Sequence, residues 1–242
     1  MNLNFERITP LGDSAIVVEF GKIIDIETHQ KVQELGLFLE KNPLPAMIEH
    51  VPSFTSVTIF YDCAKAERSQ DKKKSLSPYE YMKNQIEKTL SLIEMKSRNR
   101  PQIVDIPVCY GGEFGPDLEF VAKINHLLPE EVIEIHTSGN YLTYMIGFAP
   151  GFPYLGGLSD RITAPRCETP RLHIPAGTVG IGGKQTGIYP IASPGGWRLI
   201  GRTPLHLFNP NQSPPTLIKS GDMIRFRSIS YAEYLKLTEV KS

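Results

Sequence analysis

The chain has 242 residues with 26 basic and 26 acidic side chains, so its charge gives no reason to expect a nucleic acid or an anionic membrane as a partner. Its length suits one large domain or two small ones, and we expect two, while no segment approaches the ~18 apolar residues of a membrane-spanning helix. The three cysteines form no Cys-x-x-Cys pair, which is typical of a reducing compartment, and with no signal peptide visible we expect a soluble cytoplasmic protein.

The N-terminal part alternates strand and helix patterns. A strand, a helix and two further short strands are predicted in this order: 14–20, 25–41, 46–52 and 55–61. A polar loop is expected at 63–75, and Ser77 to Glu80 form a capping box that starts a second helix. A strand at 102–109 completes the order β-α-β-β-α-β, which predicts a ferredoxin-like α+β domain over residues 1–105.

The composition changes in the C-terminal part, because residues 111–201 contain 16 of the 20 glycines. Two helices are predicted at 116–125 and 129–136, each with proline and acidic residues at its start. Short apolar pieces follow between turns, at 141–146, 172–174, 178–182, 187–192, 197–200, 205–208, 215–219 and 222–229. This pattern predicts a β-barrel domain over residues 106–242, and a capping box from Ser230 to Glu233 predicts a final helix.

Residues 147–157 contain three aromatics, two prolines and four glycines. Proline removes backbone donors and fixes φ, so neither a helix nor a central strand suits this segment. Glycines allow close approach, and aromatic rings supply apolar area at a small cost in entropy. We expect a shaped loop at the edge of a binding cleft, with Phe148, Phe152 and Tyr154 facing the ligand.

The charge is unevenly distributed. Residues 140–242 hold 11 basic and 5 acidic side chains, whereas residues 1–139 hold 15 and 21. Arginine matches a carboxylate or phosphate with two parallel hydrogen bonds. A candidate anion site therefore consists of Arg166, Arg171, Lys184, Arg198 and Arg202; the alternative is that these side chains are solvated on the barrel exterior.

Residues 180–185, Gly-Ile-Gly-Gly-Lys-Gln, differ from a phosphate-binding loop, because Thr178 replaces the first glycine and Gln185 the Ser or Thr that would hold magnesium. The segment is either a tight barrel turn or an anion cradle. Trp197, the only tryptophan, is either core or the wall of a pocket, and Tyr189 could share either role.

The remaining candidates have weaker signals. His136 and His173 have no ligand partner at metal spacing, and His173 is the better candidate for acid-base chemistry. Cys167 has no obvious base beside it, and Ser193 lacks the Gly-x-Ser-x-Gly elbow of serine hydrolases. The residues alone therefore predict a two-domain protein with an anion-binding cleft and no recognisable catalytic unit.

Several longer motifs resemble one family. They include Gly147-Phe-Ala-Pro-Gly-Phe-Pro-Tyr-Leu-Gly-Gly157, Pro165-Arg166, Ile174-Pro-Ala-Gly-Thr-Val179, Gln185-Thr-Gly-Ile-Tyr-Pro190, Ser193-Pro-Gly-Gly-Trp197, Leu11-Gly-Asp-Ser-Ala15, Pro52-Ser-Phe-Thr-Ser56 and Ile106-Pro-Val-Cys-Tyr-Gly-Gly-Glu-Phe-Gly-Pro-Asp117. Together they span nearly the whole chain, which resembles the B subunit of bacterial 5-oxoprolinase. That family has also been called allophanate hydrolase subunit 1 and the KipI inhibitor of a sporulation kinase.

The resemblance implies a small N-terminal α+β domain and a C-terminal cyclophilin-like β-barrel. It also implies an enzyme that opens 5-oxo-L-proline to L-glutamate with ATP, with magnesium shared between this chain and its partners, the A and C subunits of the enzyme. ATP is needed because the lactam carbonyl is a poor electrophile until its oxygen is phosphorylated.

By this hypothesis Arg166 and Arg171 hold carboxylate or phosphate, and Gln185 and Ser193 orient the lactam or water. His173 and Lys184 complete the candidate set. The pocket walls are assigned to Phe152, Tyr154, Tyr189 and Trp197, and Phe148 is a further substrate-binding candidate.

A second hypothesis belongs to another class. The resemblance to KipI implies a regulatory binding protein that inhibits autophosphorylation of a sensor histidine kinase. The aromatic loop would then dock on a helical or proline-containing surface of that kinase. A peptidyl-prolyl isomerase, suggested by likeness of fold alone, is a third and weaker hypothesis.

Overall fold

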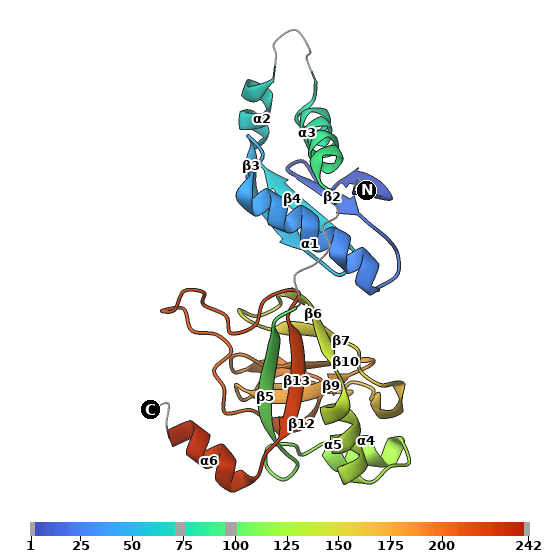
Figure 1. Cartoon of the computed structure of the whole chain (residues 1–242), viewed down its shortest axis with the longest axis vertical. Coiled ribbons are helices and arrows are strands. Elements are labelled where there is room, and N and C mark those ends of the chain that lie inside the picture. The colour runs from blue at the N-terminus through green and yellow to red at the C-terminus, as the bar shows by residue number, and fades with distance from the viewer. Residues whose placement is uncertain (1–2, 71–75, 95–100, 240–242) are drawn as a thin grey trace. The chain divides into compact units, whose positions relative to one another are not determined.

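The computed structural model describes residues 3–70, 76–94 and 101–239. It divides the chain into two compact units, Met1–Asn99 and Arg100–Ser242 (Figure 1). The division lies before strand β5 (Ile103–Tyr110), whereas the boundary predicted at residue 105 lies within that strand.

The N-terminal unit is a four-stranded antiparallel sheet with helices. The strands have the order β1-β2-β4-β3. The bounds are β1 Arg7–Pro10, β2 Ala15–Glu19, α1 Ile26–Lys41, β3 Met47–Pro52, β4 Ser56–Tyr61, α2 Cys63–Ser69 and α3 Pro78–Leu92. The strands predicted at 14–20, 46–52 and 55–61 and the helix predicted at 25–41 are confirmed, as is the capping box at Ser77, which accepts from the Glu80 N–H at 3.2 Å.

The predicted β-α-β-β-α-β order is wrong in two places. The strand predicted at 102–109 is β5, which pairs with two barrel strands rather than with the N-terminal sheet; β1, which had no clear signal, takes an edge position beside β2. Residues 63–69 form α2 rather than a loop, because the Asp62 carboxylate caps the helix by accepting from the Lys65 N–H at 2.9 Å. Residues 71–75 of that predicted loop lie outside the described residues.

One face of the N-terminal sheet is buried. Ile16 lies opposite Ile59, and Val18 lies opposite Val57, and all four are fully buried. They share one hydrophobic cluster with side chains from α1 and α3. Both helices therefore cover the same face of the sheet, as the alternation of buried and half-buried residues in β4 requires.

The C-terminal unit is a closed barrel with the strand order β10-β7-β6-β13-β5-β12-β9. Its elements are β5, α4 Leu118–Ile124, α5 Pro129–Ser138, β6 Tyr141–Ile146, β7 Pro153–Gly156, the 3-10 helix η1 Asp160–Ile162, β8 Arg171–Ile174, β9 Thr178–Gly182, β10 Gln185–Ile188, β11 Ser193–Gly195, β12 Arg198–Arg202, β13 Met223–Ser228 and α6 Tyr231–Glu239. The neighbours β5 and β13 run parallel (Figure 1). The other named pairs in the barrel are antiparallel.

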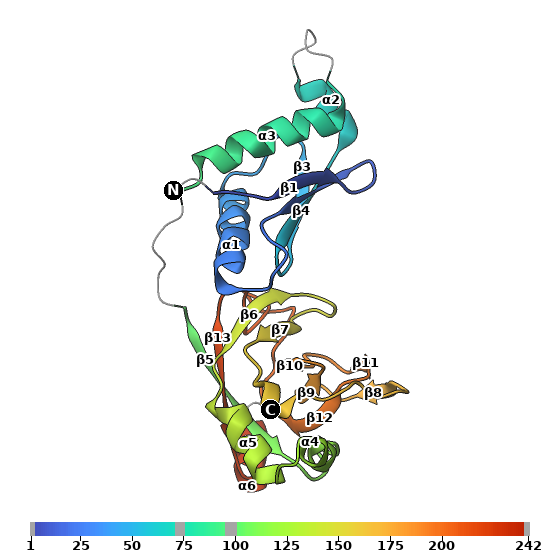
Figure 2. The same cartoon turned by 90° about the vertical axis from the view of Figure 1, so that its right-hand side faces the viewer.

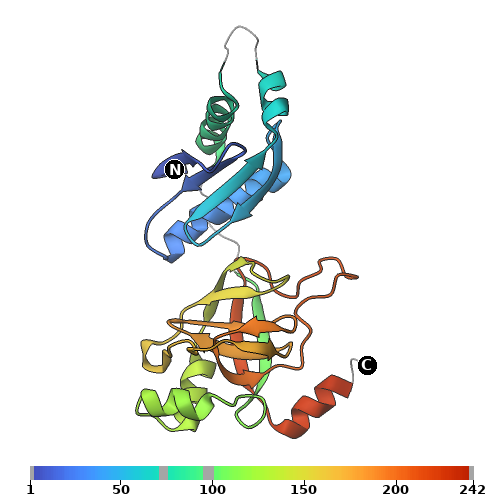
Figure 3. The same cartoon turned by 180° about the vertical axis from the view of Figure 1, so that it is seen from behind.

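Two strands stand outside the barrel. β8 and β11 pair with each other as a separate ribbon, which projects from the barrel in Figure 2. Figure 3 shows α4 and α5 beside one end of the barrel and α6 on the opposite side of that end. No helix in the described part of the chain is long and apolar enough to cross a membrane.

The predicted barrel is confirmed, but several of its strands have other bounds than predicted. The predicted helices correspond to α4, α5 and α6. The strands predicted at 187–192 and 197–200 lie at 185–188 and 198–202. The pieces at 205–208 and 215–219 form only an isolated bridge, between Phe208 and Thr216.

Candidate functional site

Five aromatic rings meet on the outside of the barrel around Phe152. We call them the aromatic cluster: Phe148, Phe152, Tyr154, Tyr189 and Trp197. The Phe152 ring centroid lies 5.6 Å from that of Phe148, 5.1 Å from Tyr154, 5.6 Å from Tyr189 and 5.7 Å from Trp197, all edge-on. Edge-to-face packing is the favoured geometry for such rings. The structure thus brings together all five aromatic residues that the sequence analysis named as substrate-binding candidates.

The loop before β7 presents the first ring of the cluster. The Gly147 N–H donates to the Phe152 carbonyl at 3.1 Å, which closes a tight loop, and Phe148 adopts a left-handed φ of 70°. Phe148 is 72% exposed, whereas Phe152 is buried. The predicted loop is shorter than residues 147–157, because residues 153–156 form the barrel strand β7, between β6 and β10.

Trp197 lies against glycines of the β9–β10 hairpin. A Cβ at Gly182 would lie 2.6 Å from the indole Nε1, and one at Gly187 would lie 3.1 Å from the ring. A Cβ at Gly180 would lie 3.3 Å from the Trp197 Cβ. These glycines allow the indole to approach the backbone. The hairpin is therefore a barrel turn covered by tryptophan, and the described contacts do not support the anion cradle.

The predicted group of basic side chains is dispersed among separate partners. Lys184 pairs with Asp160 at 2.9 Å, and both are highly exposed. The Arg198 guanidinium lies 3.8 Å from the Phe120 ring centroid, and that of Arg202 lies 4.8 Å from the Phe114 centroid. Arg166 lies 6.0 Å from the Trp197 ring centroid and forms no ion pair with any described residue.

Arg171 is paired within the protein. Its Nη2 donates to Asp117 Oδ1 at 2.9 Å, and Asp117 Oδ2 accepts from the Leu199 N–H at 2.7 Å. The hydrogen bond that Arg171 donates to Asp117 is the main cause that raises the pKa of Arg171. Sequence reasoning missed Asp117 as a functional neighbour; its only signal was its place at the end of the motif residues 106–117.

Cys167 lies beside Arg171. Arg171 Nη1 lies 3.4 Å from the Cys167 sulfur, and the Cys167 N–H donates to the Gly196 carbonyl at 2.7 Å. These contacts join the segment before β8 to the residue that precedes Trp197. They hold the end of the ribbon against the aromatic cluster.

The ribbon carries three of the predicted residues. Arg171 and His173 lie on β8 and Ser193 on β11. His173 is exposed, whereas the Ser193 hydroxyl oxygen is buried and finds no hydrogen-bond partner among the described residues. Gln185, on β10 opposite Gly182, is half-buried.

Tyr189 connects the ribbon to the aromatic cluster. A Cβ at Gly195 would collide with the Tyr189 hydroxyl, and the backbone N–H of Trp197 donates to that hydroxyl. Burial raises the pKa of Tyr189, against smaller opposing effects of this bond and of Arg166 and Arg171. Its hydroxyl is therefore neutral near pH 7.

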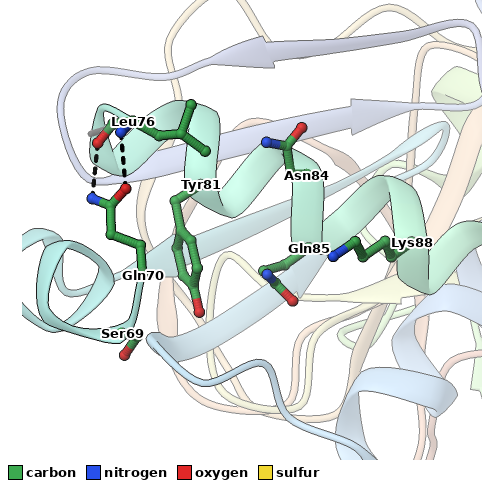
Figure 4. Close-up of a pocket in the computed structure, with 7 residues that line it drawn as sticks. All are labelled: Ser69, Gln70, Leu76, Tyr81, Asn84, Gln85 and Lys88. Atoms are coloured by element: carbon green, nitrogen blue, oxygen red, sulfur yellow. Dashed lines mark hydrogen bonds between the residues drawn. The ribbon is translucent and has the colours of Figure 1, made fainter. Parts of the chain in front are cut away.

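Two hollows in the described residues lie away from the aromatic cluster. One, of about 230 Å³, is lined in the N-terminal unit by Ser69, Gln70, Leu76, Tyr81, Asn84, Gln85 and Lys88. Figure 4 shows the Gln70 amide bonded to both backbone groups of Leu76, at 2.8 and 2.9 Å. The other is lined by Glu131, Glu134, Ile135, Ser138 and Arg161. Neither is lined by a residue of the aromatic cluster, so neither is the cleft that the sequence predicts.

Comparisons with known proteins agree with the motifs. Residues 6–218 match the family described as "Carboxyltransferase domain, subdomain C and D". The chain is 53% identical to the 5-oxoprolinase B subunit of Bacillus subtilis over 94% of this chain and 95% of that protein. It is 39% identical to the protein of the same name from Haemophilus influenzae over 91% of this chain and 96% of that protein.

A solved structure agrees with the fold. The crystal structure of TTHA0988 superposes with a TM-score of 0.76 at 30% identity. The match covers 89% of this chain and 40% of TTHA0988. On these similarities, the chain belongs to the family of 5-oxoprolinase B subunits, within the carboxyltransferase subdomain C and D proteins.

Proposed function

We propose that this chain is the B subunit of a 5-oxoprolinase, which hydrolyses 5-oxo-L-proline to L-glutamate at the expense of ATP together with the A and C subunits. The observation that carries the proposal is the 53% identity to the Bacillus subtilis protein over 95% of that protein. The motifs by which the sequence resembles this family include the residues of the aromatic cluster. This chain supplies part of the substrate site.

The chemistry of the aromatic cluster and ribbon suits a small lactam acid. Arg166 has no described carboxylate partner and lies over Trp197, so its guanidinium is available for the substrate carboxylate. Phe148, with its exposed ring, would cover the apolar edge of the ring. Arg171 acts in this proposal through its pair with Asp117 rather than as a free anion ligand.

ATP does not fit the described residues of this chain alone. A triphosphate needs converging backbone N–H groups and cations, but Trp197 covers the β9–β10 glycines. Lys184 and Arg171 are paired with Asp160 and Asp117. We therefore place ATP and its magnesium on the partner subunits in this proposal.

The test is glutamate release by the chain co-expressed with the A and C subunits, with 5-oxo-L-proline and ATP. We expect activity for the wild-type complex and a loss of about 10²-fold or more in kcat/KM for Arg166→Ala, because a charged contact to the substrate is removed. Arg225→Ala is the control, because Arg225 lies on β13 and forms an exposed ion pair with Asp105. An inactive wild-type complex would contradict the function, and full activity of Arg166→Ala would contradict only the assigned role.

Inhibition of a sensor histidine kinase is the second candidate, favoured by the 72% exposure of Phe148. An exposed aromatic ring held out by a tight loop suits contact with a protein surface. In this case the isolated chain would inhibit kinase autophosphorylation without partners, and Phe148→Ala would weaken inhibition while Arg166→Ala would not. Absence of inhibition by the isolated wild-type chain would contradict this candidate.

A further inference from the structure

A chain of hydrogen bonds lies inside the barrel wall that supports the aromatic cluster. The Tyr110 hydroxyl lies 2.7 Å from His136 Nδ1, and His136 Nε2 lies 2.9 Å from Thr186 Oγ1. Thr186 Oγ1 donates to the Gly180 carbonyl at 3.1 Å. His136 and Thr186 are both fully buried. We call this chain the polar relay.

The geometry fixes where the protons of the relay lie. Thr186 uses its only hydroxyl proton on the Gly180 carbonyl, so its oxygen must accept from His136. His136 is then protonated on Nε2, and its Nδ1 accepts from the Tyr110 hydroxyl. The polar atoms of Tyr110, His136 and Thr186 in the relay are thus all hydrogen-bonded, as buried polar groups require.

The relay and the aromatic cluster lie on opposite faces of the same hairpin. Alternation along β9 and β10 directs Ile181, Thr186 and Ile188 into the barrel core. The glycines between them, Gly182 and Gly187, lie under the Trp197 ring on the outer face. Gly180 contacts both the relay and the aromatic cluster, because its carbonyl accepts from Thr186 and its outer face lies against Trp197.

We propose that His136 is a positioning residue for the aromatic cluster: through Thr186 and the Gly180 carbonyl it fixes the glycine surface on which Trp197 lies. The part of this inference that concerns catalysis rests on the proposed function. The part that concerns Trp197 does not, because Trp197 is the only tryptophan of the chain and its fluorescence reports on its surroundings directly.

The experiment compares three threonine variants of the full chain. Thr186→Val keeps the shape of the side chain but removes the hydroxyl, so we expect red-shifted Trp197 emission and stronger quenching by acrylamide. Thr186→Ser keeps the hydroxyl and should restore the wild-type spectrum. Thr143→Val is the matched control, because the Thr143 hydroxyl is buried in the same barrel without a described partner, and its removal should leave the spectrum unchanged.

His136→Phe removes both hydrogen bonds that the imidazole makes in the relay, so it should shift the Trp197 emission in the same direction as Thr186→Val. In the assembled enzyme we expect kcat/KM of Thr186→Val to fall by about 10- to 100-fold, as small misplacements of site residues do, with Thr143→Val unchanged. An unchanged spectrum in Thr186→Val would overturn the proposal, as would a change in Thr143→Val of equal size.

A measurement on the wild-type chain keeps the proposal testable if the variants do not fold. Nitrogen-15 NMR of His136 should show the neutral ring protonated on Nε2 at pH 7; a ring protonated on Nδ1, or on both nitrogens, would overturn the relay. An inactive wild-type complex combined with the expected Trp197 shifts would refute the enzymatic function and leave the relay supported.

Discussion

Asp117 is a buried carboxylate that connects three elements. It precedes α4, it accepts from Arg171 of β8 and from the Leu199 N–H of β12, and its own N–H donates to the Leu199 carbonyl at 2.9 Å. Its side chain does not cap α4, although aspartate before a helix commonly does. A buried charge persists only with such partners, so Asp117 holds the ribbon and β12 in register with α4.

We predict that Asp117→Ala lowers the free energy of unfolding of the C-terminal unit by about 3 kcal/mol, because Arg171 and the Leu199 N–H lose their partner. Arg171 is one-third exposed, which keeps the loss from being larger. Asp105→Ala, which removes an exposed pair with Arg225, should cost no more than about 1 kcal/mol. Urea unfolding followed by Trp197 fluorescence measures both, and equal losses would contradict the role of Asp117.

His136 makes stability depend on pH. Burial lowers its pKa from 6.5 to about 3, so the folded protein binds fewer protons at this site than the unfolded chain. The resulting stability is complete above pH 6.5 and is lost progressively as pH falls from 6.5 towards 3.

We therefore predict that titration of His136 makes the free energy of unfolding about 2 kcal/mol lower at pH 5 than at pH 8. Urea unfolding at both pH values should show the loss in the wild-type chain. In His136→Gln, which does not titrate, the difference between the two pH values should be smaller by that amount. The same pH dependence in both proteins would contradict burial of a neutral His136.

The β9–β10 hairpin is an element whose sequence has two interpretations and whose contacts select one. Repeated glycines suit either backbone contacts with an anion or close packing of a ring. Gly183 supplies the turn itself, with φ of 63° and open space around it, whereas Gly182 supplies the contact with Trp197. Glycine is thus needed at positions 182 and 183 for two different physical reasons.

This difference predicts unequal effects of substitution. Gly182→Ala should displace the indole, lower stability by about 1–3 kcal/mol as overpacking does, and shift the Trp197 emission. Gly183→Asn should stay within about 1 kcal/mol of wild type, because asparagine tolerates left-handed φ. Thermal unfolding and fluorescence distinguish them, and a larger effect at Gly183 would contradict the packing explanation.

At the scale of the whole molecule, the chain consists of two units with separate hydrophobic cores. The barrel closes through β5, whose residues 103–105 pair with residues 223–225 of β13. A fragment that begins at residue 101 therefore contains the complete strand. A fragment that begins at residue 106 leaves part of β13 unpaired.

We predict that residues 101–242 fold alone and that residues 106–242 are less stable. Each lost backbone hydrogen bond costs about 1 kcal/mol, and each kcal/mol lowers the unfolding midpoint of a chain of this size by about 2–4 °C. Circular dichroism during heating measures the difference. Equal midpoints for the two fragments would contradict the placement of β5 in the barrel.

Local signals in the sequence were reliable where the interaction itself is local. The capping box at Ser77 predicted the start of α3, and the apolar piece at 222–229 predicted β13. The family resemblance also assigned Phe152, Tyr189 and Trp197 to one wall, from their positions in its motifs, and the structure packs them together.

By itself, the sequence determined the existence of a barrel and most helices, since these depend on patterns over a few residues. Its longer motifs indicated the family and the aromatic residues that the structure packs together. Only the tertiary structure decided that β5 joins the barrel, that Asp117 neutralises Arg171, and that Trp197 rather than an anion occupies the glycine surface. Those outcomes depend on contacts between residues that are distant along the chain. The local sequence of a strand, or around an arginine, does not indicate which partner it will contact.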